Sequence, residues 1–105
     1  MSNAYGYVLM PSAVKDLEGI MDYISYSLHA PDSAINLLNE IESAIESACD
    51  FPMALPPVND ELLRAKGYRK IVVRNYIVFV LPDGSQRTLN IMRVLYHGQD
   101  YLKAL

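Results

Sequence analysis

The chain has 105 residues, a net charge of −3, and 51% apolar and 20% charged residues, which is typical of a globular protein with a single domain over residues 1–105. Because no run of 18 apolar residues occurs, we expect no membrane span, and the lone Cys49 excludes an internal disulfide. No signal peptide is visible in the sequence, so we expect a cytoplasmic protein.

The N-terminal half predicts one strand followed by two helices. Residues 5–10 are rich in aromatic and β-branched side chains, which favours a strand, and Ser12 is suited to cap the helix that follows. Pro31 is suited to the first turn of a second helix, which ends near residue 50 and holds Cys49 as a buried thiol. Each helix carries one apolar stripe: Ala13, Leu17, Ile20, Ile24 and Leu28 in the first, and Ala34, Leu38, Ile41, Ile45 and Ala48 in the second. Two helices of similar length joined by a few residues predict an antiparallel hairpin.

The C-terminal half predicts three strands, at residues 68–74, 76–81 and 87–96. A proline-rich loop (53–58) and a short helical turn (59–65) precede them, and a short helix (100–105) follows. A tight turn near Asn75 joins the first two strands, and Gly84, which can adopt positive φ, favours a turn before the third. The run YIVFVL is apolar at every position, so we place it in the middle of the sheet. The predicted fold class is α+β, in the order β-α-α-β-β-β, with an antiparallel helical hairpin packed on one face of a small, mostly antiparallel four-stranded sheet.

The charge is distributed unevenly along the chain. Residues 1–60 carry one basic and nine acidic residues, whereas residues 61–105 carry eight basic and three acidic residues. The two halves therefore have net charges of −8 and +5. Solvated acidic helices would explain this pattern, and so would an acidic partner that binds the C-terminal half. We expect the basic residues on the sheet face that the hairpin leaves partly uncovered.

Five short motifs follow one another along nearly the whole chain. They are AVKDLEGI with the following YI (13–24), FP (51–52), GYR (67–69), NYIVF (75–79) and RVLY with the following QDY (93–101). Their order and spacing resemble those of the RelE/ParE toxin superfamily of bacterial type II toxin–antitoxin modules, closer to the ParE-like branch. This resemblance implies a toxin that a cognate antitoxin silences with its acidic or amphipathic C-terminal segment.

The resemblance implies one of three functions. ParE-like members inhibit DNA gyrase by binding and have no enzymatic activity, and modules of this type stabilise plasmids. RelE-like members are metal-independent endoribonucleases that cut mRNA on the ribosome. A third hypothesis is an inactive orphan member that only binds other proteins. Whether the chain is an enzyme therefore stays open at this point.

The nuclease alternative would use Arg69, Arg93, Tyr96 and His97. Two arginines can grip a phosphate, and a histidine can serve as acid or base near neutral pH. The two arginines also have structural interpretations: Arg69 starts a strand and caps or pairs with a helix carboxylate, and Arg93 needs Asp100 or a hairpin carboxylate as partner. The central strand has Tyr76 where RelE-like nucleases carry arginine, no basic pair follows Gly98, and the net charge is negative. These departures favour the ParE-like branch.

Docking of the antitoxin and of the target is expected on the basic side of the molecule. The predicted binding residues are Arg69, Lys70, Arg74, Tyr76, Arg87 and Tyr101. The eight tyrosines and five methionines favour an adaptable groove, which could also support a homodimer. We expect no cofactor and no metal site, because the two histidines are far apart in the sequence and most carboxylates lie on predicted helix exteriors.

Overall fold

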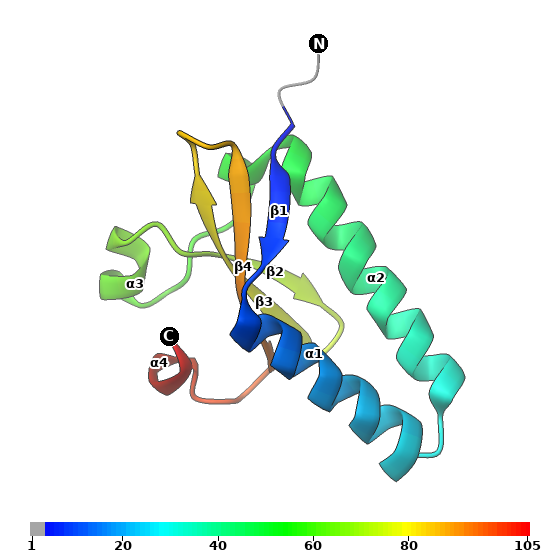
Figure 1. The fold of residues 1–105 in the computed structure, drawn as a ribbon. Coiled ribbons are helices and arrows are strands. Elements are labelled where there is room, and N and C mark those ends of the chain that lie inside the picture. Colours follow the sequence, from blue (N-terminus) through cyan, green and yellow to red (C-terminus); the bar gives the residue numbers. More distant parts are fainter. Residues whose placement is uncertain (1–3) are drawn as a thin grey trace.

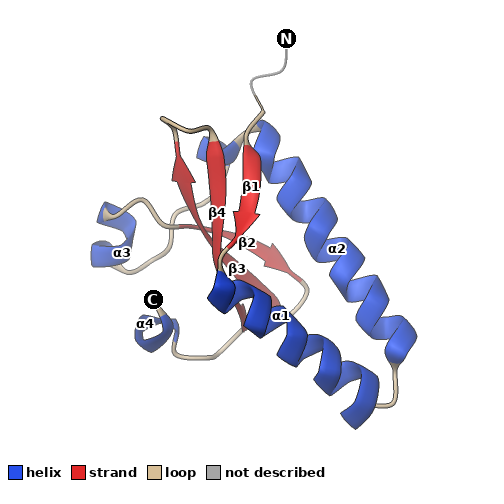
Figure 2. Ribbon diagram, in the orientation of Figure 1, coloured by secondary structure: helices blue, strands red, loops and turns tan. Residues whose placement is uncertain are grey.

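A computed structural model describes residues 4–105 (Figures 1 and 2). The elements in chain order are β1 (Gly6–Leu9), α1 (Pro11–Asp22), a π-helical segment η1 (Tyr23–Ser27), α2 (Pro31–Asp50), a 3₁₀ turn η2 (Pro52–Ala54), α3 (Glu61–Ala65), β2 (Arg69–Val73), β3 (Tyr76–Asp83), β4 (Thr88–Tyr96) and α4 (Tyr101–Ala104). The strand and helix order confirms the predicted α+β class. Within residues 4–105, no helix has both the length and the apolar character that crossing a membrane would require.

The four strands form one sheet in the order β1-β4-β3-β2. β1 runs parallel to β4, and the other two pairs are antiparallel, so the sheet is mostly antiparallel as predicted. β3 occupies an interior position, which agrees with its uninterrupted apolar sequence. The register shifts between Phe79 and Val80 at a β-bulge. There β4 carries one extra residue, Met92, which has no partner on β3.

The helical hairpin covers one face of the sheet with the larger core (Figure 1). In α2, Leu37, Ile41 and Ile45 recur every fourth residue, so they lie on one side of the helix and pack against the sheet. Leu38, which was predicted in this stripe, packs against the same core but is only partly buried, because it lies one residue, or about 100°, further round the helix than Leu37. Leu28 is 55% exposed, because the hairpin turns before that residue can reach the sheet.

The predicted cap of α1 was wrong, whereas the predicted turn before β4 is present with a different residue at positive φ. Met10 occupies the N-cap of α1, and Pro11 takes the first helical position, where its missing N–H costs no hydrogen bond. Ser12 therefore lies inside the helix. In the β3–β4 turn, positive φ is adopted by Arg87 (φ 50°) and not by Gly84. The Asp83 carboxylate sets that turn by accepting hydrogen bonds from the Ser85 hydroxyl and the Gln86 N–H, and the Ser85 bond in particular lowers the pKa of Asp83.

The opposite face of the sheet carries a second, smaller core. Val58, Leu63, Tyr68, Phe79 and Leu95 form it, and the proline-rich loop, α3 and α4 cover it in part. Tyr101 of α4 stacks on Phe79 with ring centroids 5.0 Å apart. This face is therefore partly covered, as predicted, although apolar residues and not basic ones dominate it.

Candidate functional site

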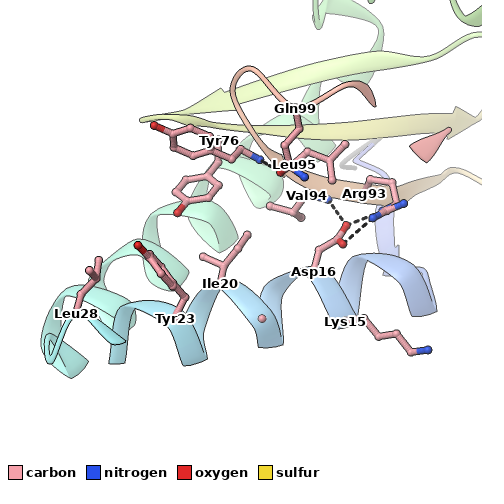
Figure 3. A pocket seen from close by; sticks show the side chains of 12 residues that line it. Lys15, Asp16, Ile20, Tyr23, Leu28, Tyr76, Arg93, Val94, Leu95 and Gln99 are labelled. Carbon is pink, nitrogen blue, oxygen red and sulfur yellow. Dashed lines mark hydrogen bonds and ion pairs between the residues drawn. The ribbon is translucent and has the colours of Figure 1, made fainter. Parts of the chain in front are cut away.

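A groove of about 670 Å³ lies between α1 and the adjoining ends of β3 and β4 (Figure 3). Its apolar and aromatic lining comes from Ile20, Tyr23, Leu28, Tyr76, Leu95 and Tyr96, and we call it the tyrosine groove. Tyr23 is 58% exposed and Tyr96 is 53% exposed. A cluster of large, exposed apolar side chains on one concave surface is the usual sign of a binding site for another molecule.

The three tyrosines of the groove lie close together. The rings of Tyr76 and Tyr96 meet edge to face, with centroids 5.6 Å apart and an interplanar angle of 76°. Burial raises the pKa of Tyr76, and the neighbouring Tyr96 and Tyr23 raise it further. The Tyr76 phenol therefore stays neutral at physiological pH. Within residues 4–105, none of the three hydroxyl groups donates a hydrogen bond.

An ion pair closes the other end of the groove (Figure 3). Arg93 of β4 donates from Nε to Asp16 Oδ2 at 2.7 Å and from Nη2 to Asp16 Oδ1 at 2.9 Å. Asp16 also accepts from the Val94 N–H at 2.9 Å, and Arg93 Nη1 donates to the Ala104 carbonyl at 3.2 Å. The hydrogen bond to Asp16 raises the pKa of Arg93, against the opposing effect of burial. Of the two partners predicted for Arg93, the hairpin carboxylate is confirmed, whereas Asp100 instead accepts from the Leu102 N–H.

A second pocket, of about 250 Å³, lies on the opposite face of the sheet. We call it the open-face pocket. Four of the predicted site residues line it: Lys70, Tyr96, His97 and Tyr101. Its floor is apolar, formed in part by Phe79 and Leu95. The His97 N–H donates to the Asn75 carbonyl at 2.6 Å, which fixes the backbone on which the imidazole is carried.

Arg69, Arg74 and Arg87 line neither of these two sites. Arg69 Nη1 donates to the Leu55 carbonyl at 2.6 Å, so the predicted carboxylate partner was wrong. The loop before β2 runs beside the start of that strand, so the Leu55 carbonyl lies within reach of the Arg69 guanidinium. Arg74 forms an exposed ion pair with Glu40 of α2, with Nε 2.6 Å from Oε2. The Glu40 hydrogen bond raises the pKa of Arg74.

The predicted site residues therefore do not form one cluster. Arg93, Tyr76 and Tyr96 meet at the tyrosine groove, and Lys70, Tyr96, His97 and Tyr101 meet at the open-face pocket. Arg87 lies before the start of β4, whereas Tyr96 ends that strand, so the two are at opposite ends of the sheet. Among residues 4–105, no group of three or more His, Cys, Asp or Glu side chains is arranged to hold a metal ion.

A family model described as the ParE toxin of the type II toxin–antitoxin system parDE matches residues 7–101. The chain belongs to the ParE toxin family. Comparison with the sequences of curated proteins gives no match. The chain is therefore the toxin of a type II toxin–antitoxin system, within the RelE/ParE superfamily.

Solved structures with the same fold come from toxin–antitoxin systems. A chain of the chromosomal ParDE system from P. aeruginosa has a TM-score of 0.73 and 16% identity, over 91% of this chain and 99% of that one. A chain of the RelBE2 toxin–antitoxin complex from Mycobacterium tuberculosis has a TM-score of 0.60 and 18% identity, over 91% of this chain and 94% of that one. At these identities the likeness concerns the fold alone.

Sequence reasoning missed most of the lining of the groove of this ParE-family toxin, including three residues of its helical wall. Asp16, Ile20 and Tyr23 are spaced by four and three residues on α1 and η1, so they share a helix face beside the core stripe. That spacing was the available signal. It was obscured because Ile20 also fits the core stripe, and because Asp16 reads as an ordinary solvated acid on a helix.

The single thiol of this ParE-family toxin gives a prediction about pH. Cys49 is 5% exposed, as the predicted buried thiol requires, and burial raises its pKa above the usual 9.0, with smaller contributions from Asp50 and Glu46. A group whose pKa is raised by folding adds stability that is fully present below the unfolded value and is lost as the pH rises through the folded value.

We therefore expect the free energy of unfolding to fall more steeply in the unaltered chain than in Cys49→Ala as the pH rises above 9.0, the usual thiol value. One proton limits the extra slope to about 1.4 kcal/mol per pH unit. Urea unfolding at a series of pH values measures both slopes. The variant also loses some packing, but that loss is the same at every pH, and equal slopes would contradict the prediction.

Proposed function

We propose that this ParE-family toxin acts by binding, as an inhibitor of DNA gyrase in the cytoplasm, and that a cognate antitoxin neutralises it. One observation carries the proposal. Arg93, a cation that phosphodiester cleavage would need, is engaged by Asp16 and the Ala104 carbonyl at all three of its nitrogens. The match to the ParE toxin family model supports the same branch.

The arrangement of the other cations also favours binding over cleavage. Cleavage of a phosphodiester needs a base, an acid and cations aimed at the developing charge. Arg69 is held by the Leu55 carbonyl and Arg74 by Glu40. Tyr76 stands in the central strand, where the nuclease branch carries arginine. Moving Arg93 onto a phosphate would leave the Asp16 carboxylate without its partner, which is costly at a site only 14% exposed.

The open-face pocket favours a second candidate function, the metal-independent mRNA endoribonuclease of the RelE-like branch. Lys70, Tyr96, His97 and Tyr101 bring a cation, an imidazole and two phenols to one small concave site. In this reading His97 is the acid or base and Lys70 stabilises the phosphate charge. The predicted Arg69 and Arg93 would have no part in it, because both are engaged elsewhere.

An antitoxin partner is supported by the two structural neighbours, which come from a ParDE system and a RelBE2 complex. We propose that the antitoxin presents an acidic or amphipathic C-terminal segment, and that a module of this kind would serve plasmid stabilisation. Of the predicted docking residues, Lys70 and Arg87 have no ion-pair partner within residues 4–105, so both remain available to an acidic partner.

Purified chain added to DNA gyrase and to a cell-free translation reaction distinguishes the candidate functions. We expect loss of gyrase supercoiling, with little effect on translation, and His97→Ala should inhibit gyrase as strongly as the unaltered chain. Arrest of translation with cleaved mRNA, lost in His97→Ala or Lys70→Ala, would instead establish the nuclease. Inertness in both reactions, with an antitoxin still bound, would favour an inactive binding member.

A further inference from the structure

The outer edge of the sheet at β1 leaves backbone groups without a partner. β1 is an edge strand that pairs only with β4 (Figure 1). The Gly6 N–H donates to the Arg87 carbonyl at 3.0 Å, and the Met10 N–H donates to the Ile91 carbonyl at 2.9 Å. Backbone groups alternate in direction along a strand, so the even-numbered residues of this segment face β4. The odd-numbered residues point their N–H and C=O groups away from the sheet.

The open part of this edge is formed by Tyr7 and Leu9. The Tyr5 N–H donates to the Cys49 carbonyl at the end of α2, at 2.8 Å, so the edge is occupied at that first position. Within residues 4–105, no group donates to or accepts from the backbone of Tyr7 or Leu9. The side chains leave the edge accessible, since Tyr7 is 38% and Val8 is 50% exposed. Two backbone donors and two backbone acceptors are therefore open to another strand.

The edge at β1 also lacks the features that usually keep strand edges apart. Charged side chains, prolines and bulges protect such edges in native sheets, and Gly6–Leu9 has none of them. The opposite edge strand, β2, begins with Arg69 and Lys70. The proline-rich loop covers its start, because the Lys70 N–H donates to the Pro56 carbonyl and Pro57 forms a bridge with Arg69. The two edges of the sheet thus differ, and the uncharged one is open.

We propose that β1 pairs antiparallel with the β1 of a second copy of this chain. A two-fold axis at Val8 places Tyr7 opposite the partner's Leu9, and Leu9 opposite the partner's Tyr7. Each of these pairs exchanges two hydrogen bonds in an antiparallel ladder, so four bonds satisfy every open group. The two copies of Val8 then form a non-hydrogen-bonded pair, with Cα atoms about 4.5 Å apart. The two sheets become one continuous sheet.

The symmetry of the open groups is what favours a second copy over an unrelated strand. A two-fold contact uses the same patch on both molecules and must be self-complementary, and this edge meets that condition without any other residue. An axis centred on Tyr7 would require the Tyr5 N–H, which α2 already holds. An axis centred on Leu9 would pair Tyr7 with Pro11, which begins a helix and has no N–H. Only the axis at Val8 uses all four groups.

The joined sheet has consequences for charge and for access to the two sites. The two-fold axis is perpendicular to the sheet, so both helical hairpins lie on the same face of it. Residues 11–50 carry eight acidic residues and one basic residue, so the two hairpins repel each other. No residue of β1 lines the tyrosine groove or the open-face pocket, and both remain accessible in the dimer.

The dimer is expected to be weak and to tighten with salt. Two four-residue strands bury little surface, which suits a dissociation constant on the order of 10–100 µM. Raising the salt from about 0.05 M to about 0.5 M screens the repulsion between the hairpins and should strengthen the dimer several-fold. A head-to-tail contact between the acidic half of one copy and the basic half of the next would weaken over the same range.

Analytical ultracentrifugation of the purified chain over a range of concentrations and at both salt levels measures the dimer. Val8→Lys should abolish it, because two ammonium groups would lie directly opposite each other, and Val8→Glu should abolish it for the same reason. An equal mixture of Val8→Lys and Val8→Glu should dimerise again, since the opposed charges are then of opposite sign. Val72→Lys is the matched control on the other edge strand, where Val72 is 60% exposed, and it should leave the dimer unchanged. Circular dichroism verifies that each variant is folded.

The contrary outcomes are distinct from one another. A monomer at every concentration and both salt levels would overturn the proposal, and so would a dimer that Val8→Lys leaves intact. A mixture of the two charged variants that stays monomeric would overturn the pairing centred on Val8. A monomeric chain that loses a cognate antitoxin in Val8→Lys would assign the edge to that partner instead. None of these results bears on gyrase inhibition, which the supercoiling reaction tests separately.

Discussion

Asp16→Ala is expected to lower the free energy of unfolding by roughly 2–3 kcal/mol, which corresponds to roughly 10–20 °C in melting temperature for a domain of this size. Asp16 accepts two hydrogen bonds from Arg93 and one from the Val94 N–H, and its side chain is only 14% exposed. Its removal leaves a guanidinium and a backbone donor with no partner at a partly buried position, which costs more than the loss of the attraction alone. Thermal and urea unfolding followed by circular dichroism measure the effect.

The exposed ion pair between Arg74 and Glu40 provides the control. Those side chains are 49% and 47% exposed, so Glu40→Ala should change the free energy of unfolding by no more than about 0.5 kcal/mol. In the double variant Asp16→Ala/Arg93→Ala, the loss should be smaller than the sum of the two single losses, because no charge is left unpaired. Equal effects of Asp16→Ala and Glu40→Ala would contradict the structural importance of the Asp16–Arg93 pair.

Phe79→Ala is expected to destabilise the protein by roughly 3–5 kcal/mol, the largest single effect among these predictions. Phe79 is 1% exposed at the centre of the second core, and Tyr101 of α4 stacks on it. The change removes the packing contacts of the aromatic ring and leaves a cavity between the sheet and the terminal helix. Small domains have about 5–15 kcal/mol of total stability, so much of it would be lost. Urea unfolding measures this difference directly.

Two further variants serve as comparisons for Phe79→Ala. Phe51→Ala should change the stability by no more than about 0.5 kcal/mol, because Phe51 is 75% exposed. Tyr101→Ala should have an intermediate effect, since it loses the stacking on Phe79 while the ring of Phe79 stays packed on Val58 and Leu95. A Phe79→Ala variant as stable as Phe51→Ala would mean that the second core contributes little to folding.

The predictions from sequence succeeded where hydrophobic periodicity decides the outcome. The uninterrupted apolar run of β3 placed it inside the sheet, because only a strand covered on both faces buries every side chain. The four-residue spacing of Ile41 and Ile45 placed α2 on the sheet. The predicted stripe named Leu38 and not the more deeply buried Leu37, because the two are equally apolar and only the rotation of α2 about its axis selects between them.

The predicted site was only partly right, since a side chain's role depends on what lies opposite it in space. Tyr76, Arg93 and Tyr96 do meet at one groove. Arg93, however, finds Asp16, 77 residues earlier in the chain, and Arg69 finds a backbone carbonyl that no pattern of side chains can predict. The charge asymmetry of the two halves likewise did not reveal that Glu40 of α2 forms an ion pair with Arg74 in the β2–β3 turn.

The sequence by itself determined the class of fold, the interior strand, the hairpin and the resemblance to a toxin superfamily, because these follow from the order and periodicity of residue types along the chain. Only the tertiary structure decided which polar groups are engaged and which are free. Packing α1 against β4 joins Asp16 to Arg93 and gathers Tyr23, Tyr76 and Tyr96 beside them. Free energies of hydrogen bonds and ion pairs depend on distance and burial, and neither quantity is a property of a residue before the chain has folded.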